Sequence, residues 1–570
     1  MYSNIQQVLK ERGMESYMEG HENGRLYMPD GMAIKKDADI PMGAMWQLVP
    51  NMPTSNSTYP MSESDVRESA SVAHVYGKKL VAVESLTTNG LQGAAYSYYP
   101  GNLKSVADLE LANGANRFVI QTSAHQPVDN MKPGVGLMVF GQWFHRHETW
   151  AEQAKAWTDY LARSSYMLQQ GKFVADVAYY YGEDNVVTGL FGEEHPAVPG
   201  GYNYDYINPE ILTNLLDYNG KQLTLPSGMS YKMLVLDKNC DSMSLPVLRK
   251  IAELANKGAI ICGEKPSVEP TMQGDKEEFQ RLANEVWSKP NVISGKSIAD
   301  ALQQAGITPD FSANDMSNLR YVHRSTDKAE IYWVNNRTVQ ARNIAATFRV
   351  KGLKPMVWHP ETGKAEDVSY EVKGDVTTVQ LSLVENDAVF VVFSGKGDDK
   401  VTLPAVQETQ LCEISTPWKV KFDTAWGGPA EVTFDQLASY TESADPGIKY
   451  YSGTAIYNNK VSINEADLQQ GSLILDLGQV SCMAEVKVNG VSAGILWKYP
   501  YRADITGLLK AGENDIEVTV VNQWVNRLIG DKQPDAKQKY TYASFDYFYH
   551  AGSELLPAGL LGPVRIVGKK

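Results

Sequence analysis

The sequence predicts a multidomain protein in which α/β units occupy roughly the first 318 residues and β-structure fills the remainder. Its 570 residues are enough for about four domains of ordinary size. Short apolar runs alternate with helical stretches as far as about residue 313, which is the pattern of β/α units. After about residue 319 the chain changes to short strands separated by turn residues, the pattern of β-sandwiches.

Composition and charge exclude several kinds of partner. The chain has 53 basic and 67 acidic side chains, for a net charge of −14, and it lacks the basic stripe that nucleic acid binding requires. The longest purely apolar run, residues 388–393, is far shorter than the roughly 18 residues that span a bilayer. The first residues show no basic leader followed by an apolar core, so we expect no signal peptide in this chain.

The first domain, residues 1–150, contains two candidate parallel strands whose ends carry polar groups. Residues 79–83 form an apolar run that leads directly into Glu84, and residues 117–121 form another, followed by His125. In a β/α barrel the carboxyl ends of the strands meet at one rim, where catalytic residues gather. We therefore expect the functional groups of this domain at that rim.

Three further domains follow. The pattern of strand, helix and strand with short joints predicts a small doubly wound α/β domain over 151–318. A small β-sandwich is expected over 319–400 and a larger one over 401–570, where Asn489-Gly490 is a hairpin signal. The expected elements of the doubly wound domain are a helix over 150–168, strands over 173–180 and 231–236, a helix over 248–255, and a strand over 259–262.

Carboxylates and histidines lie among aromatic side chains in the first 150 residues. Cleavage of a glycosidic bond requires two carboxyl groups, while aromatic rings offer flat faces to sugars and polar side chains bind hydroxyl groups. Each of these residues also has a structural interpretation, such as a salt-bridged loop carboxylate or a packing aromatic. The candidates are Glu84 for catalysis and Glu19, His21, Glu22, His125, Gln126, Trp143 and Arg146 for substrate binding.

Several motifs resemble glycoside hydrolase family 106, which comprises bacterial α-L-rhamnosidases and their relatives. They are VAVESLTTNG around Glu84, AHQPVDNMKPG at 124–134 and FGQWFHRHETW at 140–150. The runs LDLGQVSCMAEVKVNGVSAGILWKYPY, VVNQWVNRLIGD and LLPAGLLGPVRI are similar to the family's terminal β-sandwich, which is akin to the sugar-binding domain of family 2 glycosidases. The resemblance covers essentially the whole chain.

The resemblance implies a (β/α)8 barrel, a flavodoxin-like domain and two β-sandwiches, with residues 1–150 as the C-terminal portion of the barrel. It implies removal of terminal α-L-rhamnose from oligo- or polysaccharides by an inverting mechanism, with Glu84 as the general base. The general acid is expected in an Asp-Ser-x-Glu motif that is absent here, so we expect a missing N-terminal segment and impaired activity of the isolated chain.

The same resemblance implies calcium as an aid and a periplasmic or cell-surface location. Family members often carry an acidic residue where this chain has Ala44, a departure that bears on substrate preference.

Two alternatives stay open. One is a non-catalytic carbohydrate-binding protein that uses the last sandwich, although packing and hairpin pairing within the sandwich are the favoured roles of its aromatic residues. The other is a retaining enzyme similar to β-galactosidases, which would need two nearby glutamates at strand ends where the sequence shows one. The candidate lining residues of the sandwich are Trp497, Tyr499, Tyr501, Trp524 and Asn526.

Overall fold

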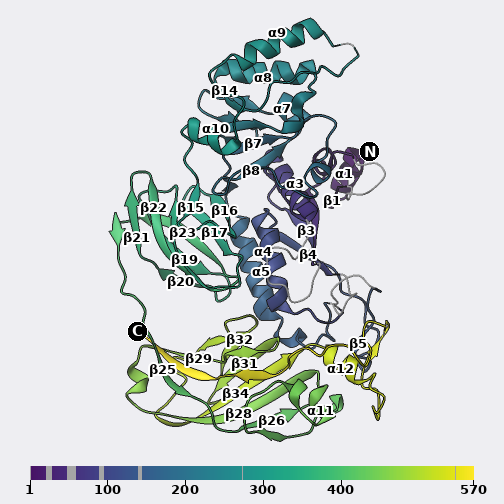
Figure 1. Cartoon of the computed structure of the whole chain (residues 1–570), viewed down its shortest axis with the longest axis vertical. Helices are drawn as coiled ribbons and strands as arrows, with labels where there is room; N and C mark the ends of the chain where they lie inside the picture. Colours follow the sequence, from purple (N-terminus) through teal and green to yellow (C-terminus); the bar gives the residue numbers. More distant parts are fainter. Residues whose placement is uncertain are drawn as a thin grey trace.

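A computed structural model describes residues 2–20, 29–47, 60–88, 95–138, 144–272, 274–545 and 547–570. It consists of two α/β parts and two antiparallel β-sandwiches (Figure 1). The first α/β part lies at the centre of the view, with the second above it, the small sandwich at its left and the last sandwich below. Along the chain, the two α/β parts come first and the two β-sandwiches follow.

The first α/β part is built on a parallel sheet of four strands. Its elements are α1 (Tyr2–Glu11), β1 (Tyr17–Glu19), α2 (Gly31–Lys35), β2 (Ile40–Gln47), α3 (Pro60–Tyr76), β3 (Ala82–Thr88), α4 (Pro100–Ala112), β4 (Arg117–Ile120) and the short β5 (Pro133–Gly134). The strands lie in the order β1-β2-β3-β4, as expected for consecutive β/α units. Met45 and Val83 are buried in one cluster with Leu103 and Val106 of α4, so helices cover one face of the sheet.

The second α/β part has a five-stranded parallel sheet. Its elements are η1 (Ala151–Gln153), α5 (Lys155–Leu168), β7 (Val177–Tyr180), α6 (Val187–Leu190), β8 (Tyr204–Ile207), α7 (Pro209–Asn214), β9 (Asp217–Tyr218), β10 (Leu223–Thr224), β11 (Ser230–Tyr231), β12 (Met233–Leu236), η2 (Lys238–Asp241), α8 (Leu245–Lys257), β13 (Ile260–Cys262), α9 (Lys276–Trp287), β14 (Val292–Ile293) and α10 (Ile298–Gln304). The order β8-β7-β12-β13-β14 is the 2-1-3-4-5 order of flavodoxin-like sheets. Helix α8 has the predicted apolar spacing and ends at Gly258, whose φ is 101°.

The small sandwich packs two antiparallel sheets around an aromatic core that includes Tyr332, Phe348 and Phe393. Its strands are β6 (Lys172–Phe173), β15 (Phe311–Ala313), β16 (Leu319–Ser325), β17 (Ala329–Asn336), β18 (Arg342–Phe348), β19 (Leu353–His359), β20 (Lys364–Asp367), β21 (Tyr370–Lys373), β22 (Val376–Leu383), β23 (Ala388–Lys396) and β24 (Lys400–Val401). Because β6 pairs with β16 and β15 pairs with β18, two segments from the range 151–318 belong to this sandwich.

The last sandwich also consists of two antiparallel sheets, joined to short helical turns. Its elements are β25 (Glu408–Glu413), β26 (Trp418–Phe422), η3 (Thr424–Trp426), β27 (Val432–Phe434), η4 (Tyr440–Glu442), α11 (Pro446–Lys449), β28 (Gly453–Ile463), η5 (Asp467–Gln469), β29 (Ser472–Asp476), β30 (Gln479–Val480), β31 (Met483–Val488), β32 (Val491–Leu496), β33 (Arg502–Asp504), β34 (Gly512–Asn522), α12 (Val525–Gly530), β35 (Tyr542–Ala543), β36 (Leu560–Gly562) and β37 (Arg565–Lys569). Asn489 and Gly490 join β31 to β32 and both have positive φ, as a type I′ hairpin turn requires.

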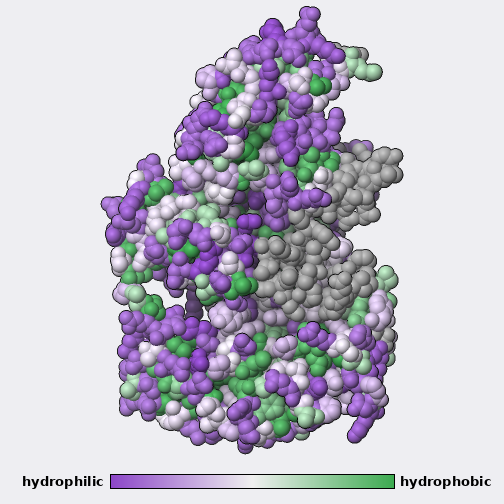
Figure 2. Space-filling model, viewed as in Figure 1, coloured by the Kyte–Doolittle hydropathy of each residue, from purple (hydrophilic) through white to green (hydrophobic). Residues whose placement is uncertain are grey.

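The surface of the molecule is largely hydrophilic on the face shown in Figure 2, with hydrophobic residues scattered among polar ones. Among the described residues, no helix is both long enough and apolar enough to cross a bilayer. All four cysteines are free thiols, and three of them are buried.

A buried ion pair joins the central helices to the small sandwich. Lys104 Nζ lies 2.6 Å from Asp108 Oδ2, and the two side chains are 0% and 1% exposed. Tyr160 of α5 and Asn335 of β17 both donate to Asp108, while Lys104 donates to the carbonyl oxygen of Asn386 at 2.8 Å. Buried charges are tolerated only when paired and fully hydrogen-bonded, so this cluster fixes how α4, α5 and the sandwich pack.

We predict that Lys104→Met lowers the free energy of unfolding by about 3–5 kcal/mol, because it leaves Asp108 as an unpaired buried charge. The matched control is Lys155→Met in α5. Lys155 forms the same i,i+4 lysine–aspartate pair with Asp159 but is 77% exposed, so its loss should not shift the transition measurably. Urea unfolding followed by circular dichroism checks both, and equal effects of the two substitutions would contradict the assignment.

Candidate active site

Glu84 lies within β3, on the face of the sheet that helices do not cover. It is in register with Ala44 of β2 and Val119 of β4, and Val119 is 36% exposed. The prediction that the strand ends before Glu84 is wrong, because β3 runs from Ala82 to Thr88. The residue is half-buried.

Two side chains hold one oxygen of this carboxylate. Trp46 Nε1 donates to Glu84 Oε1 at 3.1 Å, and Thr87 Oγ1 donates to the same oxygen at 2.6 Å. Both donors are on the open face of the sheet, from β2 and β3. Among the described residues no donor contacts Oε2, which leaves this oxygen for water or substrate.

Thr87 reaches Glu84 because β3 contains a β-bulge. Residues three apart on a regular strand point to opposite faces. Here Met45 pairs with Ser85 but Trp46 pairs with Thr87, so Leu86 is an extra residue, and its φ is 65°. The bulge moves Thr87 to the face that carries Glu84 and Trp46.

Gln121, which follows β4, completes the network. Its amide lies 2.6 Å from Thr87 Oγ1, but the Thr87 hydroxyl has a single hydrogen, which it donates to Glu84 Oε1. The amide group of Gln121 therefore donates to Thr87, since its oxygen and nitrogen are interchangeable by a flip. Regular alternation along the strand places Thr87 on the face opposite Glu84, so the sequence does not indicate its role. For Gln121, the only indication in the sequence is the change from apolar to polar residues after residue 120.

The other predicted acid of this sheet is Glu19, which is exposed at the end of β1. It is in register with Met42, and Met42 with Ala82, so Glu19 shares the face of Glu84 two strands away. Strand spacing and rise per residue place the two backbones about 12 Å apart. His21, Glu22 and Trp143 lie outside the described residues.

The loop after β4 brings three predicted residues close together. Gln126 is buried, and its amide accepts from Val135 N at 2.9 Å and donates to Val135 O at 2.7 Å. Arg146 donates to the carbonyl oxygen of Gln126 at 2.8 Å and to Asp129 Oδ1 at 2.6 Å. His125 is exposed beside them. Gln126 and Arg146 thus hold the loop in place, and a sugar contact from them stays a prediction.

Two titratable side chains of the same region, His145 and Glu148, have shifted pKa values. Burial, and then the positive charges of His147 and Arg146, lower the pKa of His145 to about 4. Burial also raises the pKa of Glu148 well above its usual range. The His145 side chain is therefore neutral at pH 7.

The part of the chain that the structure describes contains no preformed cluster of acidic, histidine or cysteine ligands for calcium. No group of three or more histidine, cysteine, aspartate or glutamate side chains there is arranged to hold a metal ion. Calcium prefers six to eight oxygen ligands that include carboxylates. The described residues do not fit this requirement, and no chemical step is assigned to calcium.

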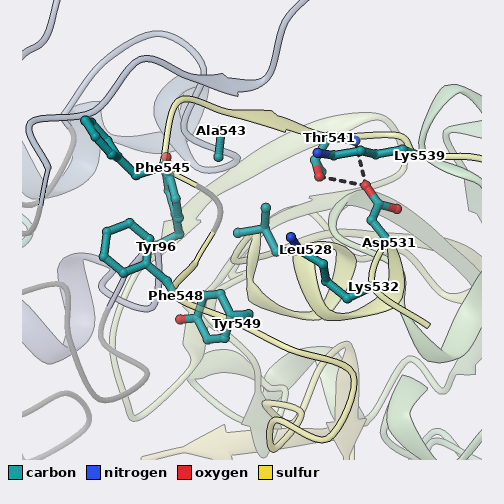
Figure 3. Close-up of a pocket in the computed structure, with 10 residues that line it drawn as sticks. All are labelled: Tyr96, Leu528, Asp531, Lys532, Lys539, Thr541, Ala543, Phe545, Phe548 and Tyr549. Atoms are coloured by element: carbon teal, nitrogen blue, oxygen red, sulfur yellow. Dashed lines mark hydrogen bonds between the residues drawn. The ribbon is translucent and has the colours of Figure 1, made fainter. Parts of the chain in front are cut away.

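The last sandwich packs against the loops that follow β3 and β4. Its strand β35 pairs with β5, Tyr549 donates to the carbonyl oxygen of Ala95, and Trp524 Nε1 donates to that of His147 at 2.8 Å. Figure 3 shows the resulting cavity, in which Thr541 donates to Asp531. The residues lining it are Tyr96, Leu528, Asp531, Lys532, Lys539, Thr541, Ala543, Phe545, Phe548 and Tyr549.

Most of the aromatic residues proposed as a sugar-binding surface on the last sandwich are packed inside. Trp497 and Trp524 are buried, Tyr501 donates to the carbonyl oxygen of Cys482 at 2.9 Å, and Asn526 bonds both backbone groups of Leu556. The exception is Tyr499. Its side chain is 48% exposed, and it lines a cavity of about 320 Å³.

We predict that His145 makes stability depend on pH below neutrality. The unfolded chain binds a proton on this side chain near pH 6.5, whereas the folded protein does so only near pH 4. The free energy of unfolding therefore falls as the pH decreases from about 6.5 to about 4. His145→Gln should reduce this fall, with parallel curves above pH 7. Urea unfolding at a series of pH values checks it, and parallel curves throughout would contradict it.

The chain is similar to known glycoside hydrolases. The alpha-L-rhamnosidase family of glycoside hydrolases, family 106, matches residues 1–372. A solved rhamnosidase from Novosphingobium sp. PP1Y is 41% identical, with a TM-score of 0.94, and the match covers all of this chain and 55% of that one.

A curated "Putative beta-glucuronidase" from Formosa agariphila is 27% identical, and the match covers 94% of this chain and 66% of that protein. The chain thus spans about half the length of the solved rhamnosidase and about two thirds of the curated relative. Since the family match covers well over half of the chain, the chain belongs to glycoside hydrolase family 106, the alpha-L-rhamnosidase family.

Proposed function

We propose that this chain carries the general base of a glycoside hydrolase that removes terminal α-L-rhamnose from oligo- or polysaccharides, and that Glu84 is this base. The observation that carries the proposal is the setting of Glu84. It lies on the open face of a parallel sheet, and Trp46 and Thr87 fix one carboxylate oxygen. The 41% identity with a solved rhamnosidase over the whole chain supports the choice of sugar.

The geometry of Glu84 suits a base in an inverting reaction. With Oε1 held by two donors, Oε2 accepts the proton of a water molecule as its oxygen attacks the anomeric carbon. A separate acid protonates the leaving oxygen at the same time. Oε2 thus accepts the proton, and the hydrogen bonds to Oε1 fix the orientation of the carboxylate.

The general acid comes from outside the network described above. Inverting enzymes place their two carboxyl groups about 6.5–9.5 Å apart. We propose that the sheet β1-β2-β3-β4 is part of a (β/α)8 barrel, because an all-parallel sheet is normally covered on both faces and this one has Val119 exposed. An acid on the remaining barrel strands would face Glu84 across the barrel, and Glu19 is the alternative on this chain.

A second candidate function is carbohydrate binding without catalysis. Tyr499 favours it, because its ring is 48% exposed in a cavity shared with Tyr99, Gln523 and Glu385. Titration calorimetry with rhamnose-containing oligosaccharides tests it, with Tyr499→Ala as the variant. Heat that disappears in Tyr499→Ala would support this function, and absence of heat with every sugar would remove it.

We predict that Glu84→Gln lowers kcat on an aryl α-L-rhamnoside by about 10²–10⁴-fold, the contribution of a general base. The assay is run with and without calcium, and Glu277→Gln, in the exposed first turn of α9, is the control. Unchanged activity of Glu84→Gln would contradict its role as base.

The same assay is run on the chain alone and on the chain joined to any coding sequence that lies in frame before Met1. A recovered Asp-Ser-x-Glu motif that restores activity would support the proposed acid. Export to the periplasm or cell surface is proposed from the family resemblance alone, and cell fractionation with an antibody against the chain tests it.

A further inference from the structure

A second glutamate lies directly behind the bulge of β3. Glu110 of α4 is 0% exposed, and its Oε2 lies 3.0 Å from Ser85 Oγ. The backbone N–H of Leu86 also faces this carboxyl group. Glu110 therefore lies against the two residues at which β3 leaves regular register with β2.

The hydrogen bonds around Ser85 are compatible with a neutral Glu110. Ser85 Oγ lies 3.1 Å from the carbonyl oxygen of Val83 and 3.0 Å from Glu110 Oε2. A carbonyl oxygen can only accept, and the hydroxyl has one hydrogen. If Ser85 donates to Val83, the contact with Glu110 needs a proton on the carboxyl group. A neutral Glu110 donates from Oε2 to Ser85, which satisfies both contacts of the Ser85 hydroxyl. Burial, which raises the pKa of Glu110 well above its usual range, agrees with this form.

The bulge needs such support. Leu86 has a φ of 65°, a left-handed conformation that is strained for a non-glycine residue and persists only where the surroundings fix it. A bulge also removes a backbone group from the regular ladder. Glu110 supports this segment from the helix-covered side of the sheet, through its contact with Ser85 next to the bulge.

We propose that Glu110 is a positioning residue for Glu84: its neutral carboxyl group holds the Leu86 bulge, and the bulge places the Thr87 hydroxyl on Glu84. The inference rests on the proposed role of Glu84 as general base. It assigns to Glu110 a structural hydrogen-bonding task that requires a donor and an acceptor on one side chain. Glutamine has both, and leucine has neither.

The first test uses the Trp46 indole N–H, which donates to Glu84, as an NMR probe in protein labelled with ¹⁵N-tryptophan. Trp46→Phe identifies its signal among those of the eleven tryptophans. We expect Glu110→Gln to leave the signal in place and Glu110→Leu to move it in the same direction as Thr87→Val. A signal that stays in place in Glu110→Leu, or that moves equally in Glu110→Gln, would overturn the inference.

The second test is kinetic. Glu110→Leu should lower kcat about 10–100-fold with KM within threefold, whereas Glu110→Gln should keep kcat within threefold and leave the pH–rate profile unchanged between pH 5 and 8. If Glu110→Leu does not fold, Ser85→Ala replaces it, with a smaller change of the Trp46 signal in the same direction expected. An unchanged signal in Ser85→Ala would then count against the inference.

The two tests separate this inference from the proposed function. Full activity of Glu84→Gln would remove Glu84 as the base, yet the NMR signal would still report whether Glu110 holds the bulge. Loss of activity in Glu84→Gln with normal kcat in Glu110→Leu would keep the base and overturn the role of Glu110.

Discussion

One extra residue in β3 determines which side chains face Glu84. In a regular strand Thr87 would point into the helix-covered core, and Glu84 would have Trp46 as its only donor in this network. Leu86, at a φ of 65°, shifts the register by one residue and brings Thr87 opposite Trp46. A carboxylate with one oxygen held by two donors has a defined direction, which is what a base needs to act on a single water molecule.

Helix α4 links this local feature to the larger architecture. One of its carboxyl groups, Glu110, supports the bulge, and another, Asp108, forms the buried pair with Lys104 and accepts from α5 and the small sandwich. Displacement of α4 would therefore disturb both the domain junction and the strand that carries Glu84. The last sandwich adds a further constraint, because it bonds the loops after β3 and β4. The β-domains thus act on the candidate site through packing.

The sequence patterns correctly predicted secondary-structure elements that are determined by local periodicity. The strand at 117–121, helix α8 with its glycine end and the Asn489-Gly490 hairpin are confirmed. Glu84 was identified as a candidate, but the end of its strand was placed wrongly, since apolar runs do not reveal a bulge. Thr87 and Glu110 escaped notice for a related reason: their roles depend on contacts between β3 and α4, and alternation alone assigns Thr87 to the opposite face. Gln126 was predicted to bind substrate because its side chain is polar, but its amide group is hydrogen-bonded to the backbone of Val135.

The most direct test of the account is a crystal structure of the Glu84→Gln variant soaked with an α-L-rhamnoside. The account predicts the rhamnose ring on the open face of β1 to β4, with a water molecule between residue 84 and the anomeric carbon and with Thr87 bonded to the substituted side chain. A sugar found only in the cavity beside Tyr499, with no density near residue 84, would contradict it.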